Sequence, residues 1–153
     1  MADLLTHWAA AQLPAAFSRD RRIAALVVIG TFLPDLASKG LYWVLKSGGD
    51  FTTPTHSLLG LAVLSYGAAL FVEVRLRRPA FIALLVGGLV HVAVDLLKDN
   101  LGMGASYLFQ PFSTASYELG LIDPLNVILL VPVDLGILLL AWTLERRLRR
   151  VQQ

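Results

Sequence analysis

Apolar residues run through this chain in long blocks, and polar residues gather in the connections between the blocks. Such runs, which lack the alternation of half-buried strands, are typical of membrane-embedded helices. A helix needs about 20 apolar residues to cross a bilayer, with a lower limit near 17. Four segments are predicted to cross on this basis, although the first is short: Ile23–Ala37, Ser57–Val74, Ala80–Leu97 and Leu125–Leu144.

A fifth helix is predicted at about Leu4–Phe17, which is rich in alanine and too short to span comfortably. Pro34 is expected to end the regular helix of the first span, because proline lacks a backbone N–H. The connections Lys39–Pro54 and Asp99–Pro124 are rich in Gly, Ser, Thr and Pro, so they are predicted to be loops. These elements together predict an all-α, polytopic membrane helical bundle that forms a single domain over residues 1–153.

Composition supports the membrane interpretation and narrows the chemistry. The chain is 56% hydrophobic and 16% charged, and its mean hydropathy of +0.67 lies well above that of a soluble domain. It contains no cysteine, which excludes a disulfide framework, a thiolate zinc site and a cysteine nucleophile. The sequence pI is about 9.2, but such apolar surroundings argue against a nucleic-acid surface, and no nucleic-acid partner is expected.

The arginines indicate how the chain lies in the membrane. All of them fall in three clusters, at residues 19–22, 75–78 and 146–150. Four spans place the three clusters on the same side of the bilayer, and the positive-inside rule makes that side cytoplasmic. The C-terminus is then cytoplasmic, and the two long loops face outward.

Three histidines and two aspartates lie in or beside apolar stretches, where ionisable groups are costly and point to a functional site. They are His7, Asp35, His56, His91 and Asp95. Counted from the nearest arginine cluster at about 1.5 Å per helical residue, all five lie roughly 18–28 Å from the arginine plane. For His7 this requires the N-terminal helix to re-enter from the outer side. The five residues are therefore predicted to share one layer towards the outer face.

The residue types in this layer favour a metal site. His91 and Asp95 are four residues apart, so they share a helix face. Imidazole nitrogens and carboxylate oxygens suit zinc, with manganese or iron as alternatives. The set could hold one ion, or two ions that share a bridging carboxylate and together activate water and hold a phosphate. Asp95 is the candidate bridge, and Asp95 and His91 are the expected catalytic residues.

Simpler interpretations exist for each element. A single histidine in an apolar helix commonly fills a packing position, and His91 and Asp95 could bond only to each other. Thr55-His56-Ser57 could be a helix start in which Thr55 or Ser57 serves as the cap. None of these interpretations predicts a shared depth, so the common layer favours the metal site.

Two further acidic residues are less certain participants. Asp134 lies in an apolar span and reaches the same layer, so it could support a ligand or form a hydrogen bond between helices. Glu118 belongs to the second outer loop and is expected to be solvated.

The ordered motifs resemble those of the YdjM/YbcI-like family of bacterial and archaeal inner-membrane proteins, which are regarded as metal-dependent hydrolases. The resemblance covers most of the chain. The matching motifs are His7, Leu33-Pro34-Asp35, Thr55-His56-Ser57-Leu58-Leu59, the run GLVHVAVD at residues 88–95, and the Pro-containing loop at residues 108–113. By this resemblance the protein is expected in the cytoplasmic (inner) membrane.

That family is in turn distantly similar to the zinc-dependent phospholipase C and P1 nuclease group, an all-α fold whose zinc cluster hydrolyses phosphoesters. The similarity implies that His7, Asp35, His56, His91 and Asp95 are ligands, with Asp95 bridging two ions. The chain departs from the family pattern in two places. It lacks the Asp-His that commonly follows Pro-Asp-x, and residues 51–53 (Phe-Thr-Thr) stand where many members have His-Arg-Gly. A full three-metal cluster is therefore not expected.

The leading hypothesis is a membrane-embedded metal-dependent hydrolase that cleaves a phosphoester, or an ester, of a membrane lipid or lipid-linked substrate by metal-activated water. The first alternative is a transporter or non-catalytic metal-binding membrane protein. A transport path predicts polar residues continuing to the arginine side, yet none lies between Arg22 and Thr31 or between Arg78 and His91. The second alternative is a structural accessory subunit whose polar groups only join helices.

Overall fold

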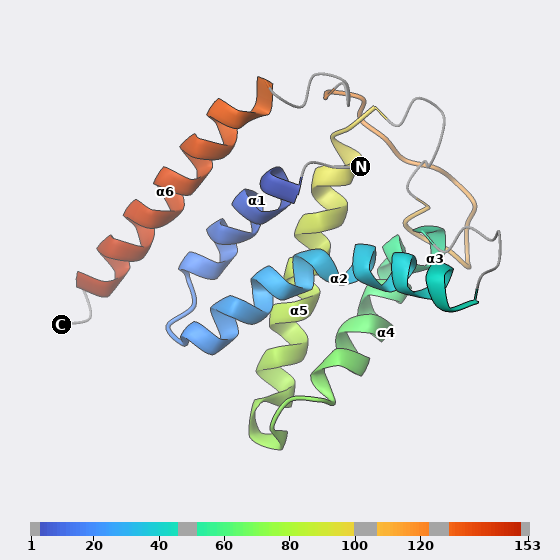
Figure 1. Cartoon of the computed structure of the whole chain (residues 1–153), viewed down its shortest axis with the longest axis horizontal. Coiled ribbons are helices and arrows are strands. Elements are labelled where there is room, and N and C mark those ends of the chain that lie inside the picture. Colours follow the sequence, from blue (N-terminus) through green and yellow to red (C-terminus); the bar gives the residue numbers. More distant parts are fainter. Residues whose placement is uncertain (1–3, 46–51, 100–106, 123–128, 151–153) are drawn as a thin grey trace.

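The computed structural model describes residues 4–45, 52–99, 107–122 and 129–150, and the elements in this part are helices (Figure 1). The prediction of an all-α fold is therefore confirmed. A 3-10 turn, η1 (Val74–Leu76), precedes the fifth helix. The α-helices are α1 (Leu4–Ala16), α2 (Arg21–Leu45), α3 (Thr52–His56), α4 (Leu58–Ala69), α5 (Arg77–Leu96) and α6 (Val131–Arg150).

Two helical stretches are long and apolar enough to cross a membrane, namely Arg21–Val44 and Val74–Leu96. They contain the first predicted span and all of the third except its last residue, Leu97. The second is shorter than predicted, because α4 has 12 residues and ends at Ala69. At about 1.5 Å per residue, α4 is only some 18 Å long. Of the fourth predicted span, residues 125–128 lie outside the part of the chain that the structure describes. The residues from Val131 onward form helix α6.

The helical path between the first and second predicted spans differs from expectation. Pro34 does not end the first helix, because α2 continues to Leu45. Proline removes one helical hydrogen bond, and that cost is tolerated where its ring is packed among neighbouring helices; Pro34 is fully buried. The predicted loop Lys39–Pro54 is therefore wrong at both ends, where α2 and α3 lie, and residues 46–51 fall outside the described part.

Two glycines allow α2 and α5 to approach closely. A Cβ added to Gly30 would lie 2.3 Å from the carbonyl oxygen of Leu84, and one added to Gly87 would lie 2.0 Å from that of Val27. Both distances are far below van der Waals contact, so only glycine fits at these positions. Small residues commonly permit such backbone contact between membrane helices.

The same crossing sets the register of the site. The Thr31 hydroxyl donates a hydrogen bond to the Gly87 carbonyl oxygen across the two helices, at 3.0 Å. Both helices run away from an arginine cluster, so the residues one turn further on also face each other. Those residues are Asp35 and His91. The glycine crossing thus determines where two of the predicted site residues meet.

The arginine clusters and the predicted site lie at opposite ends of the bundle. In Figure 1 the α1–α2 turn, the α4–α5 turn and the end of α6 lie towards the bottom and lower left, whereas α3, the start of α1 and the end of α5 lie on the other side. Apolar residues pack between the two ends. They form two buried clusters, one of Ala15, Val27 and Ala83 and the other of Ala69, Ala80 and Leu84.

The described part of the second long loop, residues 107–122, contains no regular helix, in agreement with the prediction. Backbone hydrogen bonds attach it to two elements of the bundle. Leu58 at the start of α4 donates to the Leu108 carbonyl, and Leu119 and Ile122 donate to the carbonyls of Leu96 and Leu97 at the end of α5. The loop therefore reaches both helix ends that adjoin the predicted site.

Candidate metal centre

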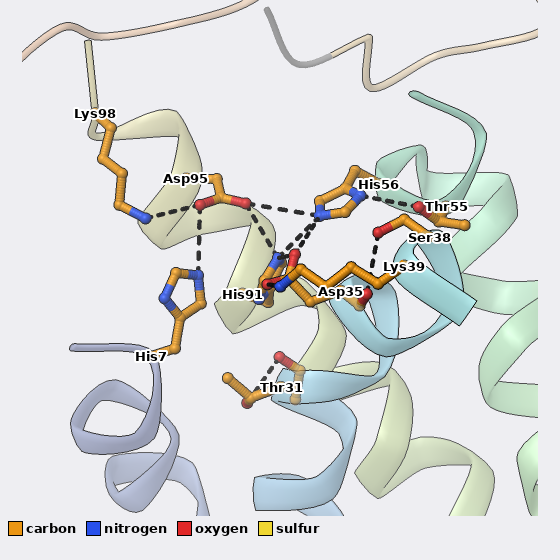
Figure 2. Close-up of polar contacts among 11 residues, drawn as sticks. His7, Thr31, Asp35, Ser38, Lys39, Thr55, His56, His91, Asp95 and Lys98 are labelled. Atoms are coloured by element: carbon orange, nitrogen blue, oxygen red, sulfur yellow. Dashed lines mark hydrogen bonds and ion pairs between the residues drawn. The ribbon is translucent and has the colours of Figure 1, made fainter. Parts of the chain in front are cut away.

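All five side chains of the predicted layer converge at one place (Figure 2). α1 contributes His7, α2 contributes Asp35, α3 contributes His56, and α5 contributes His91 and Asp95. The three histidines are buried, whereas the two carboxylates are 30% and 23% exposed. The histidines thus form the closed side of the cluster, and the carboxylates form its more open side.

Two histidine nitrogens lie close to each other and to one oxygen of each aspartate, at distances near those between the ligands of a tetrahedral ion. The His56 Nε2 and His91 Nε2 atoms are 3.0 Å apart. Asp35 Oδ1 lies 3.5 Å from the first of them and 3.8 Å from the second, and Asp95 Oδ2 lies 3.8 Å and 3.1 Å from the same two atoms. Zinc–ligand bonds of about 2.0–2.1 Å place tetrahedral ligands roughly 3.3 Å apart. The five measured distances bracket that value.

A second group of potential ligands consists of His7, His91 and Asp95. His7 Nε2 lies 3.4 Å from Asp95 Oδ1, which is the carboxylate oxygen turned away from His56. The His7 and His91 rings are 4.2 Å apart between centroids. Asp95 therefore has histidines on both sides, which is the placement expected of a bridging carboxylate.

The segment Thr55-His56-Ser57 both starts a helix and orients a ligand candidate. The Thr55 hydroxyl lies 3.0 Å from His56 Nδ1, so this contact fixes the ring and leaves Nε2 facing the cluster. The Ser57 side chain accepts a hydrogen bond from the Gly60 amide and caps α4. The capping alternative for Ser57 is thus confirmed, and it coexists with the placement of His56 in the cluster.

Two lysines complete the cluster, and sequence reasoning missed both of them. Lys39 Nζ lies 2.8 Å from Asp35 Oδ2, and Lys98 Nζ lies 2.8 Å from Asp95 Oδ1. Asp35 thus directs one oxygen to His56 and His91 and the other to Lys39, whereas the Asp95 oxygen that pairs with Lys98 also faces His7. The spacings i, i+4 and i, i+3 were the available signal, since they place the charges on a shared helix face.

The sequence matches the YdjM inner membrane protein family over residues 3–151. The chain belongs to this family. No curated protein and no solved structure matches it. The family description establishes an inner membrane protein and names no reaction, and the comparisons add no support for the similarity to phospholipase C and P1 nuclease.

Of the two less certain acidic residues, Asp134 is buried and Glu118 is exposed. The Thr6 hydroxyl donates a hydrogen bond of 3.0 Å to Asp134 Oδ2. This bond joins α1 to α6 next to His7, so the predicted hydrogen bond between helices is confirmed. Asp134 thereby holds the start of α1 beside the cluster, while neither described ligand group includes Glu118.

The donor set fits a transition-metal ion. Two imidazole nitrogens and two carboxylate oxygens are suitable zinc ligands, and they come from three helices that the glycine crossing and the capped turn hold in place. The His56 and His91 Nε2 atoms face each other at 3.0 Å, so one ring can donate a hydrogen bond to the other when no ion lies between them. The cluster can therefore hold an ion on its histidine side and admit a ligand on its carboxylate side.

Proposed function

We propose that this protein is a metal-dependent hydrolase of the inner membrane that cleaves a phosphoester of a lipid or lipid-linked substrate. The observation that carries the proposal is the convergence of potential ligand atoms, in which His56 Nε2 and His91 Nε2 lie 3.0 Å apart and each lies within 3.8 Å of an oxygen of both Asp35 and Asp95. Zinc suits this mixture of nitrogen and oxygen donors best, with manganese or iron as alternatives.

An ion held by these residues would polarise a phosphoryl oxygen and make water more acidic at neutral pH. In the hydrolysis, the water oxygen bonds to phosphorus, the ester P–O bond breaks, and a proton from water reaches the departing alkoxide. The buried histidines keep their positions throughout.

A lipid substrate is supported by the surface around the cluster. The loop at residues 107–122 exposes large apolar side chains: Phe112 is 85% exposed, Leu121 73% and Leu119 62%. Exposed large apolar side chains are typical of contact with a membrane or an apolar partner. A headgroup at the membrane surface would therefore meet the carboxylate side while its acyl chains stay in the bilayer.

The proposed topology has four crossings, with the three arginine clusters and the C-terminus in the cytoplasm. In this topology α4 belongs to the second crossing and α6 to the fourth. The separation of the arginine segments from the cluster in Figure 1 supports this arrangement, in which the site faces outward.

The transporter alternative receives less support. An ion path would need polar groups between the cluster and the arginine side. The described residues in that region include two apolar clusters, and the last polar side chain before Asp35 on α2 is Thr31, whose hydroxyl bonds to backbone carbonyls. A one-sided pocket is the simpler interpretation.

Hydrolysis can be tested with zinc-loaded protein in lipid nanodiscs and a panel of phospholipids and lipid-linked phosphates. We expect chelator-sensitive release of a phosphorylated or dephosphorylated headgroup, and we expect Asp95→Asn to abolish it. Asp20→Asn is the matched control, because the exposed Asp20 caps the start of α2 at the arginine end and asparagine caps equally well. If the zinc-loaded protein cleaves none of the panel, or if Asp95→Asn retains full activity, the proposed reaction is wrong.

A further inference from the structure

Lys98 is a buried lysine placed directly against the proposed centre. Its side chain is only 8% exposed, and its ammonium lies 2.8 Å from Asp95 Oδ1. Lysine is almost never buried without a strong electrostatic reason, because removing an ammonium from water is costly. Among the described residues, the only hydrogen-bond acceptor of this ammonium is Asp95. An ammonium carries three N–H donors, so two of them remain for another acceptor.

The position of Lys98 affects how many ions the cluster can hold. In a two-ion centre bridged by Asp95, the second ion would lie at Oδ1, next to His7. The Lys98 ammonium already occupies that side of the carboxylate. His91 also presents its Nε2 atom to both aspartates, and one imidazole nitrogen binds a single ion. The cluster therefore has room for one metal ion, and the Lys98 ammonium takes the place of a second.

The backbone holds Lys98 in this place. The chain at the end of α5 pairs with the second outer loop: Asp99 donates to the Ile122 carbonyl, and Ile122 donates to the Leu97 carbonyl. Lys98 is thus held between two backbone hydrogen bonds, one to each side. A long side chain that starts from a fixed backbone loses little freedom when it binds an anion.

The charges of the cluster favour an anion once a metal is present. The two aspartates, the buried Lys98 and a divalent ion would together carry a net positive charge, even when the exposed and water-screened Lys39 is left out. In a poorly hydrated site such a charge strongly favours an anionic ligand over a neutral one. Figure 2 shows that Lys98 and His7 approach one oxygen of the Asp95 carboxylate, whereas His56 and His91 approach the other.

We propose that Lys98 binds an anionic oxygen of the substrate's phosphate group beside a single metal ion, in the place that a second ion takes in two-metal enzymes. This rests on the proposed function and narrows it, since the substrate is then a phosphoester and not a neutral ester. Lys98 binds the phosphate oxygen and does not take part in bond breaking. His7 contacts Asp95 Oδ1, the oxygen that also pairs with Lys98, and so positions that carboxylate.

Lys39 provides a matched control. It pairs with Asp35 at the same distance of 2.8 Å, but its side chain is 46% exposed, against 8% for Lys98. Water screens an exposed charge pair and leaves little net interaction. Removal of the Lys39 charge should therefore affect anion binding far less than removal of the Lys98 charge.

The test measures the binding of inorganic phosphate to cobalt-substituted protein in detergent. Binding is monitored by calorimetry and by changes in the visible spectrum of the cobalt ion. We expect Lys98→Gln and Lys98→Met to weaken phosphate binding about 10- to 100-fold, Lys98→Arg to restore most of it, and Lys39→Gln to weaken it less than about 3-fold. Metal content should stay at about one ion per chain in every variant. Two neutral replacements are used so that a folding defect in one leaves the other informative.

Several results would overturn the proposal. The first two concern phosphate affinity, which would be unchanged in the neutral Lys98 variants or would fall equally in Lys98→Gln and Lys39→Gln. The third is loss of the metal ion from both neutral Lys98 variants. The fourth is that the unaltered protein binds no phosphate. Hydrolysis is measured separately. Lys98-dependent phosphate binding without any hydrolysis would leave this inference standing and remove the proposed function, whereas hydrolysis with Lys98-independent binding would do the reverse.

Discussion

Substitution of Gly87 by alanine tests whether the crossing of α2 and α5 sets the geometry of the metal centre. The new Cβ would lie 2.0 Å from the Val27 carbonyl oxygen, whereas ordinary contact begins at 3.4 Å. The obstacle is backbone, so the helices must separate by about 1.4 Å to restore contact. One turn further on, this separation moves His91 Nε2 from 3.8 Å to about 5 Å from Asp35 Oδ1, well beyond the roughly 3.3 Å between tetrahedral zinc ligands.

Gly87→Ala is therefore expected to lower the free energy of unfolding by about 1–3 kcal/mol. We expect the same variant to weaken zinc binding about 10- to 100-fold, although it changes no ligand. The control is Gly40→Ala in α2, where an added Cβ meets nothing within 4 Å. It should be neutral or stabilise the helix by up to roughly 1 kcal/mol, because alanine is the better helix former.

The assay is thermal unfolding in detergent, combined with competition for zinc against a chromogenic chelator. Thermal unfolding reports the packing of the two helices, and competition reports the ligand geometry. If Gly87→Ala bound zinc as tightly as Gly40→Ala and unfolded at the same temperature, the crossing would not control the site.

Three further predictions concern single features of the molecule. His91→Ala should lose the metal, because His91 belongs to both ligand groups, whereas His7→Ala should retain it with affinity reduced less than about 10-fold; metal analysis after gel filtration distinguishes them. Asp134→Ala should destabilise the protein by about 1–3 kcal/mol in chemical unfolding, because the buried Thr6 hydroxyl loses its acceptor, and an unchanged midpoint would contradict this. A reporter active only outside the cytoplasm should be silent when fused after the C-terminal arginine cluster and active when inserted after Phe112; the opposite pattern would invert the topology.

The residues of the candidate site could be found from the sequence because two physical constraints act on them. Ionisable groups among apolar residues must find one another, and helical rise converts sequence separation into depth. Counting from the arginines therefore grouped His7, Asp35, His56, His91 and Asp95, which the structure brings together. Whether they ligate a metal stays a prediction.

The missed features depend on tertiary packing. Pro34 was expected to stop its helix, and the loop assigned after it hid the fact that Lys39 lies one turn beyond Asp35 on the same helix. The burial of Lys98 depends on backbone pairing between the end of α5 and residues 119–122, which no local pattern reveals. The length of α4 was overestimated, because its apolar composition continues past Ala69 although the helix does not.

The most direct test of the central claim is the metal content of the purified protein. Protein prepared from metal-replete cells and analysed by inductively coupled plasma mass spectrometry should contain about one transition-metal ion per chain, most of it zinc. His91→Ala, prepared in parallel and shown to be folded by circular dichroism, should contain almost none. An unaltered protein without bound metal, or a His91→Ala variant with the full complement, would contradict the account.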